Sequence, residues 1–194
     1  MGDPAPAAFP PMDVAGRVPR LRDAMGEGGV EALLVTHLTN IRYLTGFAGS
    51  AGLLVVTPEG LHLVTDGRYA DQAPTQLAAA GVEATVGVSS DDQKSLVAAA
   101  LGEAGRLGLE ADHVSWAQHS RYAAEWFPGV ELVATTGLVE GLRLTKDPGE
   151  VARIAAAAAI ADEALGRVLP LLGDRPTELE FGRALDAAIR ELGA

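Results

Sequence analysis

The chain contains 194 residues, 48% hydrophobic and 21% charged, enough for one sizeable hydrophobic core with a small additional element. It contains no cysteine, which excludes disulfides and thiolate metal sites. Its net charge of −11 argues against nucleic acid or anionic membranes as partners, because both require a basic face. No apolar run reaches the roughly eighteen residues of a membrane span, and the proline-rich start lacks a basic region, so we expect a cytoplasmic protein.

The first 145 residues predict alternating helices and strands. Residues 1–12 contain five prolines or glycines and no periodic apolar face, so we expect a disordered tail. Apolar spacing, capping residues and turn residues predict the elements that follow. The predicted helices cover 14–25, 40–44, 66–80, a segment capped by Ser89, Ser90 and Asp91 that ends near Gly105, and 115–126. The predicted strands cover 32–36, 52–57, 61–65, 82–88, 107–110 and 130–134, with a hairpin turn at Pro58–Gly60.

These elements predict an α/β fold in which helices cover both faces of a mixed sheet of about six strands. A boundary follows near residue 146, where Asp147 and Pro148 suit the N-cap and first turn of a long alanine-rich helix over 150–169. Thr177 and Glu180 then form a predicted capping box at the start of a second helix. We expect these two C-terminal helices to expose an apolar face or to bury it against a partner.

Two polar, glycine-containing segments interrupt this pattern. The first is NIRYLTGFAGSAG at residues 40–52, where three glycines provide a loop able to come close to another molecule. The second is DGRYADQ at residues 66–72, directly after the predicted hairpin. Together, and in this order, they resemble the N-terminal domain of the creatinase/prolidase group of metallopeptidases, which includes the Xaa-Pro aminopeptidases and prolidases. A further resemblance is to the junction at which the catalytic domain of that family begins, and it is carried by Arg143, Lys146, Glu150 and Val151.

The resemblance implies a fold, a division into domains and an activity. It implies a ribonuclease H-like N-terminal domain over 13–145, followed at 146–194 by the opening helices of a truncated pita-bread catalytic domain. In this family the catalytic domain holds two divalent metal ions (manganese, cobalt or zinc) through two aspartates, one histidine and two glutamates, and hydrolyses the peptide bond next to proline. We expect those ligands to lie beyond residue 194, so that this chain has no cofactor and is inactive alone.

The resemblance also implies a homodimer formed through the N-terminal domain, which lies across the active-site mouth of the partner subunit. The substrate-gating loop carried over from the family is Phe47, Ala48, Gly49 and Ser50. No cationic residue lies between Thr45 and Gly52, where a creatinase-type enzyme would need one for the carboxylate of its substrate. This difference favours a peptidase that acts on proline-containing peptides.

The other polar residues of the two segments are interpreted as structural: Asn40, Arg42, Tyr43, Asp66, Arg68 and Tyr69. Asp66 suits a helix cap and an ion pair with Arg68, and Arg42 is a second candidate partner for its charge. Tyr69 and Gln72 are candidates to satisfy buried polar groups beside the sheet.

Other chemistry has weaker support in this sequence. Ser50 lies between glycines, but a strand follows it instead of the strand-to-helix turn of a G-x-S-x-G hydrolase, and no Walker lysine occurs. His113 and His119 lie near Glu110 and Asp112, yet solvated or core-edge histidines are a simpler interpretation than a metal site. We therefore assign no catalytic residue and no metal ligand. The alternative function is a stand-alone binding or scaffold protein of the same fold without peptidase activity.

Overall fold

The computed structural model describes residues 9–193, which form two compact units. One unit spans Asp13–Thr145, and the other combines residues 146–193 with residues 9–12. The predicted disordered tail lies mostly outside the described residues, and its last part, residues 9–12, contains no helix or strand. No helix in the described part of the chain is long and apolar enough to cross a membrane.

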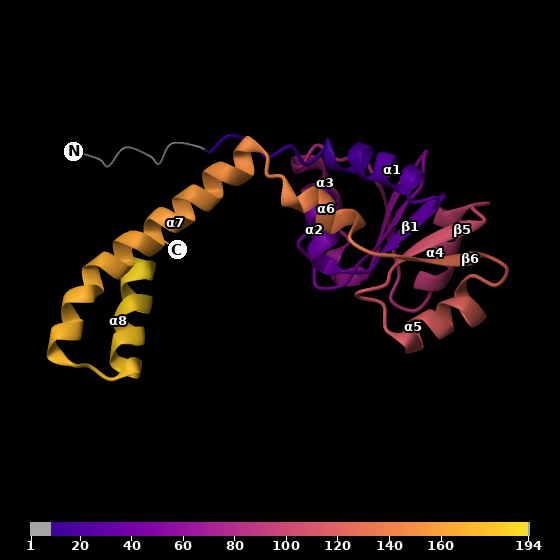
Figure 1. Cartoon of the computed structure of the whole chain (residues 1–194). Coiled ribbons are helices and arrows are strands. Elements are labelled where there is room, and N and C mark those ends of the chain that lie inside the picture. Colours follow the sequence, from indigo (N-terminus) through magenta and orange to yellow (C-terminus); the bar gives the residue numbers. More distant parts are fainter. Residues whose placement is uncertain (1–8, 194) are drawn as a thin grey trace. The chain divides into compact units, whose positions relative to one another are not determined.

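A mixed six-stranded sheet forms the centre of the first unit (Figure 1). The strand order is β4-β3-β2-β1-β5-β6. The β1–β5, β5–β6 and β3–β4 pairs are parallel, whereas β2 pairs antiparallel with both β1 and β3. The strands are β1 (Ala32–Val35), β2 (Leu53–Val56), β3 (Leu61–Thr65), β4 (Thr85–Val88), β5 (Arg106–Glu110) and β6 (Glu131–Thr135). The predicted fold class and its β2–β3 hairpin are confirmed.

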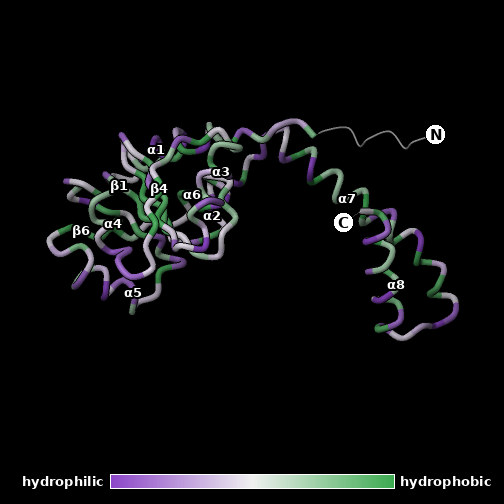
Figure 2. Tube along the Cα trace, turned by 180° about the vertical axis from the view of Figure 1, so that it is seen from behind, coloured by the Kyte–Doolittle hydropathy of each residue, from purple (hydrophilic) through white to green (hydrophobic). Residues whose placement is uncertain are grey.

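Helices cover both faces of this sheet, because its central strands bury apolar side chains on both sides. Leu33 and Val35 of β1 pack on one face with α1, α2, α3 and α6, whereas Leu34 packs on the other face with α4 and the segment after α5. Figure 2 shows hydrophobic residues concentrated along the strands at the centre of the unit. The helices are α1 (Arg17–Glu27), α2 (Leu38–Thr45), α3 (Gln72–Ala79), α4 (Gln93–Leu101), α5 (Trp116–Arg121) and α6 (Leu138–Leu144).

The cap of α4 differs from its prediction. The side chain of Asp92 accepts the Ser95 N–H at 3.1 Å and is the N-cap, so the predicted cap at Ser89–Asp91 is wrong. The Ser89 hydroxyl instead accepts the Asp92 N–H at 2.9 Å and shapes the turn before the helix. The helix ends at Leu101, four residues before the predicted end.

Three other helical segments also differ from their predictions. The helix predicted over 66–80 is divided into a 3-10 turn, η1 (Gly67–Tyr69), and α3. The helix predicted over 115–126 ends in a π-helical turn, η2 (Tyr122–Trp126). Helix α6 is absent from the predicted elements, because a seven-residue segment with an internal glycine carries little periodic signal.

The second unit is a helical hairpin in which α8 (Glu178–Glu191) returns along α7 (Pro148–Val168), joined by the 3-10 segment η3 (Leu169–Asp174) (Figure 1). The predicted N-cap at Asp147 and the predicted capping box of Thr177 with Glu180 are present. Glu150 also completes a capping box with Asp147, which the sequence analysis did not predict. The small core between the helices contains Ala164, Val168 and Ala188. Large apolar side chains stay exposed on both helices, among them Val151, Ile154, Leu165 and Leu179.

Candidate functional site

The predicted gating loop begins where α2 ends. Gly46 has a left-handed backbone (φ 76°) that terminates the helix, and its N–H donates to the Arg42 carbonyl at 2.8 Å. Phe47 then turns into the core and is only 1% exposed. Gly49 crosses this ring so closely that a Cβ would lie 2.8 Å from its Cε1, so the crossing requires glycine. The surface of the loop is therefore made by residues 48–50, above a buried aromatic anchor.

The two segments singled out in the sequence meet at Ser50 and Tyr69. The Ser50 N–H donates to the Tyr69 hydroxyl at 3.0 Å, and Ser50 Oγ lies 2.7 Å from the same oxygen. The Tyr69 ring also packs edge-on against Phe47, with ring centroids 5.5 Å apart. Because both groups of Ser50 can donate to a phenolate, the Ser50 hydroxyl, followed by its N–H, lowers the pKa of Tyr69 from its usual value.

Gln76 of α3 holds the other side of the loop. Its Oε1 accepts the Ala48 N–H at 2.8 Å. Gln76 lies one helical turn beyond Gln72, the residue for which the sequence suggested a contact with buried polar groups. Where the loop leads into β2, Thr65 donates its hydroxyl to the Ala51 carbonyl at 2.6 Å.

Asp66 caps η1 and pairs with Arg68. Its Oδ1 accepts the Arg68 N–H at 3.0 Å, and its Oδ2 lies 2.8 Å from Arg68 Nη2. The side-chain hydrogen bond between them lowers the pKa of Asp66 and raises that of Arg68. The alternative pairing of Asp66 with Arg42 is wrong, because both carboxylate oxygens of Asp66 are engaged by Arg68.

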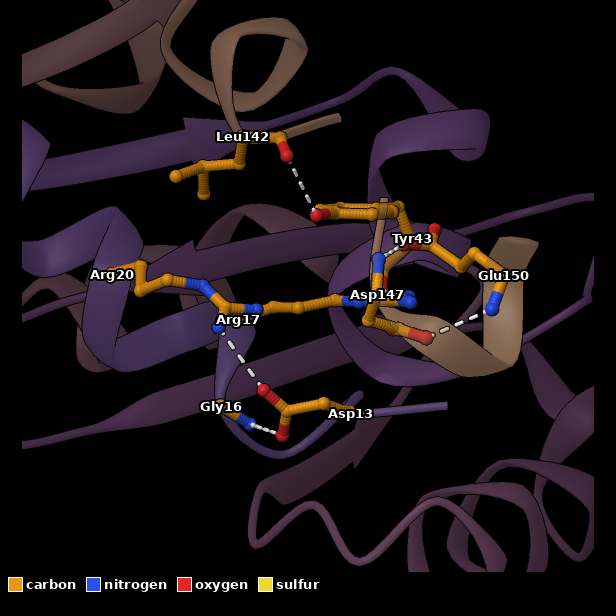
Figure 3. Close-up of polar contacts among 8 residues, drawn as sticks. All are labelled: Asp13, Gly16, Arg17, Arg20, Tyr43, Leu142, Asp147 and Glu150. Carbon is orange, nitrogen blue, oxygen red and sulfur yellow. Dashed lines mark hydrogen bonds and ion pairs between the residues drawn. The ribbon is translucent and has the colours of Figure 1, made fainter. Parts of the chain in front are cut away.

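Tyr43 connects α1, α2 and α6 (Figure 3). Arg17, only 3% exposed, donates from Nη1 to the Tyr43 carbonyl at 2.7 Å and stacks 4.0 Å above the Tyr43 ring. The Tyr43 hydroxyl donates to the Leu142 carbonyl at 3.1 Å. Beside these contacts, Arg20 forms an exposed ion pair with Asp13 at 3.0 Å. The predicted loop and its preceding helix are thus joined to two further helices of the unit.

Asn40 is completely buried and bridges two carboxylates that the sequence analysis did not assign to it. Its Nδ2 donates to Glu110 Oε1 at 2.7 Å and to Glu140 Oε1 at 2.6 Å. Its Oδ1 accepts Nη1 of Arg143 at 3.1 Å. Sequence separation conceals this network, since Glu110 and Glu140 lie 70 and 100 residues beyond Asn40.

Glu110 lies at the end of β5 and is 9% exposed. Its Oε2 accepts the backbone N–H of Thr36 at 2.6 Å and that of His37 at 2.8 Å. These donors lie where β1 passes into α2, so Glu110 satisfies backbone groups at the helix start that would otherwise be unpaired. A short strand ending in a glutamate is the only sequence signal for this role.

The segment that contains these contacts matches a known family. Residues 17–145 match the family model of the creatinase/prolidase N-terminal domain. The chain belongs to this family.

Individual relatives of this creatinase/prolidase N-terminal domain include peptidases. The peptidase YqhT of Bacillus subtilis, described as uncharacterized, is 33% identical over 178 residues, covering 92% of this chain and 50% of that protein. The Xaa-Pro dipeptidase from Bacillus anthracis superposes with a TM-score of 0.81 at 30% identity, covering 93% of this chain and 50% of that one. The N-terminal domain of the cytoplasmic peptidase PepQ from Mycobacterium tuberculosis superposes with a TM-score of 0.58 at 34% identity, covering 66% of this chain and 99% of that domain. The chain thus spans about half the length of the first two relatives.

A cavity of about 160 Å³ lies beside the Glu110 network, at the carboxyl ends of the parallel strands β1, β5 and β6. His37, Asp112, His113 and Glu140 contribute to its lining. The rings of His37 and His113 stack with their centroids 4.5 Å apart.

The described residues of this creatinase/prolidase N-terminal domain do not fit a metal centre. Within them, no group of three or more histidine, aspartate or glutamate side chains is arranged to hold a metal ion. Glu110 is engaged by backbone and amide donors, and His119 stacks on Trp116 with ring centroids 5.4 Å apart instead of approaching His113.

Proposed function

We propose that this chain acts as the non-catalytic N-terminal domain of an enzyme that hydrolyses the peptide bond before or next to proline. Membership in the creatinase/prolidase N-terminal domain family is the observation that carries the proposal. Its likeness to an Xaa-Pro dipeptidase over 93% of the chain supports it further. The domain contributes dimerisation and substrate gating, and a dinuclear centre of manganese, cobalt or zinc is supplied by residues other than those described here.

The geometry of the loop suits a gating role. Residues 48–50 carry small side chains, so they leave room for a peptide, and their backbone is held over Phe47 by Tyr69 and Gln76. A loop whose backbone is held by such contacts keeps one conformation when a substrate binds, which reduces the conformational entropy that the loop loses on binding. In the proposed homodimer this loop borders the active-site mouth of the partner subunit, in the cytoplasm, and the partner molecules are proline-containing peptides.

A chimera tests this role. The chain replaces the matched half of the Bacillus anthracis Xaa-Pro dipeptidase, and kcat/KM is measured for dipeptides and longer peptides that contain proline. Ala48→Trp in this chimera should narrow the entrance and lower kcat/KM for longer peptides relative to dipeptides by roughly tenfold. The matched control is Ala123→Trp, an exposed alanine in η2, which should leave the ratio unchanged. If this chimera does not fold, a second chimera that transfers only residues 47–50 into the dipeptidase allows the same measurements.

Two results would contradict the proposal. Turnover of a proline dipeptide by the 194-residue chain alone, with added manganese or cobalt, would show that the unit is itself catalytic. An unchanged peptide preference in a folded Ala48→Trp chimera would remove the gating role. Light scattering of the chimera tests the dimer, and a folded monomer with full activity would remove the proposed dimerisation role.

A further inference from the structure

We propose that Tyr69 is a positioning residue that acts through Ser50 to hold the turn at residues 48–50 in the shape it presents to the substrate. The inference rests on the proposed gating function of that loop. Tyr69 belongs to the DGRYADQ segment, which is separate from the loop in the sequence. In the folded chain its side chain contacts the loop. Tyr69 itself need not contact the substrate.

The loop depends on side chains for its shape. Among the described residues, no backbone-to-backbone hydrogen bond outside the regular elements joins residues 47–51 to another segment. The N–H groups of Phe47, Ala48 and Ser50 are instead accepted by the side chains of Thr45, Gln76 and Tyr69, respectively. Since a segment without a backbone ladder is ordered only by such contacts, removing one of them should change its conformation.

Tyr69 makes the largest share of these contacts. Its hydroxyl meets both the N–H and the Oγ of Ser50, at 3.0 and 2.7 Å, and its ring packs edge-on against Phe47. The tip of the loop and its buried anchor are therefore both in contact with one side chain. The side chain of Gln76, by comparison, makes one hydrogen bond to this loop, from the Ala48 N–H.

The orientation of Tyr69 is itself fixed by its neighbours. Asp66 begins η1 by accepting the Arg68 N–H, and its carboxylate also holds the Arg68 guanidinium. That guanidinium lies 5.2 Å from the centroid of the Tyr69 ring, within the range of a cation–π contact. The path of contact thus runs from Asp66 through Arg68 and Tyr69 to Ser50.

The hydrogen bond can be measured in the 194-residue chain without any catalysis. Because donation from Ser50 lowers the pKa of Tyr69, Ser50→Ala should raise this pKa toward the usual tyrosine value. An NMR titration of chains labelled at the tyrosine ring carbon Cζ measures it. Tyr122 provides an internal comparison, since burial raises its pKa. It should titrate after Tyr69 and be unaffected by Ser50→Ala. A Tyr69 pKa that Ser50→Ala leaves unchanged would show that the contact does not form.

The functional test uses the chimera described above. Tyr69→Phe keeps the ring but removes the hydroxyl, and it should change the ratio of kcat/KM between longer peptides and dipeptides by about 3- to 10-fold, mainly through KM. Ser50→Ala removes the Oγ contact but keeps the N–H contact, so it should change the ratio in the same direction by a smaller factor. The double variant should change the ratio no further than Tyr69→Phe alone, because the hydroxyl of Tyr69 is the partner of both groups. Tyr122→Phe, which removes a hydroxyl on the opposite face of the sheet, is the matched control and should leave the ratio unchanged.

The outcomes separate this inference from the gating proposal. If Ala48→Trp alters peptide preference but Tyr69→Phe and Ser50→Ala do not, the loop is a gate and Tyr69 does not position it. If the effects of Tyr69→Phe and Ser50→Ala on the ratio are independent and additive, the inference is also wrong. If Ala48→Trp has no effect, the gating function itself fails.

Discussion

Asn40 donates from Nδ2 to Glu110 Oε1 at 2.7 Å, and this contact joins the first turn of α2 to the end of β5. Glu110 simultaneously accepts the N–H groups of Thr36 and His37. One buried carboxylate therefore sets where β1 ends and where α2 begins. The proposed gating loop follows at the other end of α2, where Gly46 terminates the helix.

Asn40→Asp should destabilise the fold strongly. The change replaces an amide donor with a carboxylate that faces both Glu110 and Glu140, so two hydrogen bonds are lost and like charges are brought together. We expect the free energy of unfolding to fall by about 2–4 kcal/mol at neutral pH, measured by urea denaturation. Part of the loss should be recovered at pH 5, where the introduced carboxyl can be protonated. Thr39→Ala, at the exposed neighbouring position, is the control and should change stability by less than about 0.5 kcal/mol.

Glu140 should titrate below the usual glutamate range. Burial acts to raise its pKa, but the Asn40 amide, its own backbone N–H and the charges of Arg143 and His37 together lower it. Because the pKa is lower in the folded state, the interaction stabilises the fold above the pKa of unfolded glutamate and is lost as the pH falls through the folded pKa. The contribution should be small, since Glu140 is exposed. Side-chain carbon NMR measures the titration, and Asn40→Ala should raise the pKa; an unchanged value in that variant would contradict the assignment.

Gly49→Ala should disturb the loop at its anchor. The added methyl would overlap the ring of Phe47, which is too deeply buried to move freely, so overpacking should cost about 1–3 kcal/mol. Gly141→Ala is the matched control, because its Cβ would meet nothing within 4 Å and α6 should gain about 0.5–1 kcal/mol. Thermal unfolding of the two variants measures the difference. Equal melting temperatures would show that the loop is not held against Phe47.

Arg17→Lys should destabilise the junction of α1 and α2 although it preserves the charge. Lysine cannot reproduce the planar stack on Tyr43 together with the hydrogen bond to its carbonyl, and the side chain is almost completely buried. We expect a loss of about 1–2 kcal/mol in the free energy of unfolding. Arg20→Lys is the control, because it changes only an exposed ion pair, and it should change the free energy of unfolding by less than about 0.5 kcal/mol. Urea denaturation measures both variants, and coinciding curves would contradict the prediction.

Turns and helix caps were predicted well where they depend on residues that are close together in the sequence. The β2–β3 hairpin follows from its turn residues, the N-cap of α7 follows from Asp147 before Pro148, and the capping box of α8 follows from Thr177 and Glu180, three positions apart. The α4 cap was missed by one residue, because Ser89, Ser90, Asp91 and Asp92 are all chemically suitable and only their placement in the turn distinguishes them. Helix α6 was missed because it is short and is stabilised by packing on α1 and α2.

The sequence by itself determined the family, the order of the strands and of the helices other than α6, and the two segments at residues 40–52 and 66–72. The elements follow from local periodicity, and the family follows from residue types in a fixed order. Only the tertiary structure decided which side chains meet. Ser50 and Tyr69 are brought together by the β2–β3 hairpin, and Asn40 meets Glu110 because parallel β1 and β5 end at the same edge of the sheet. Such contacts join residues far apart in the chain, and no local pattern records the path that the backbone takes between them.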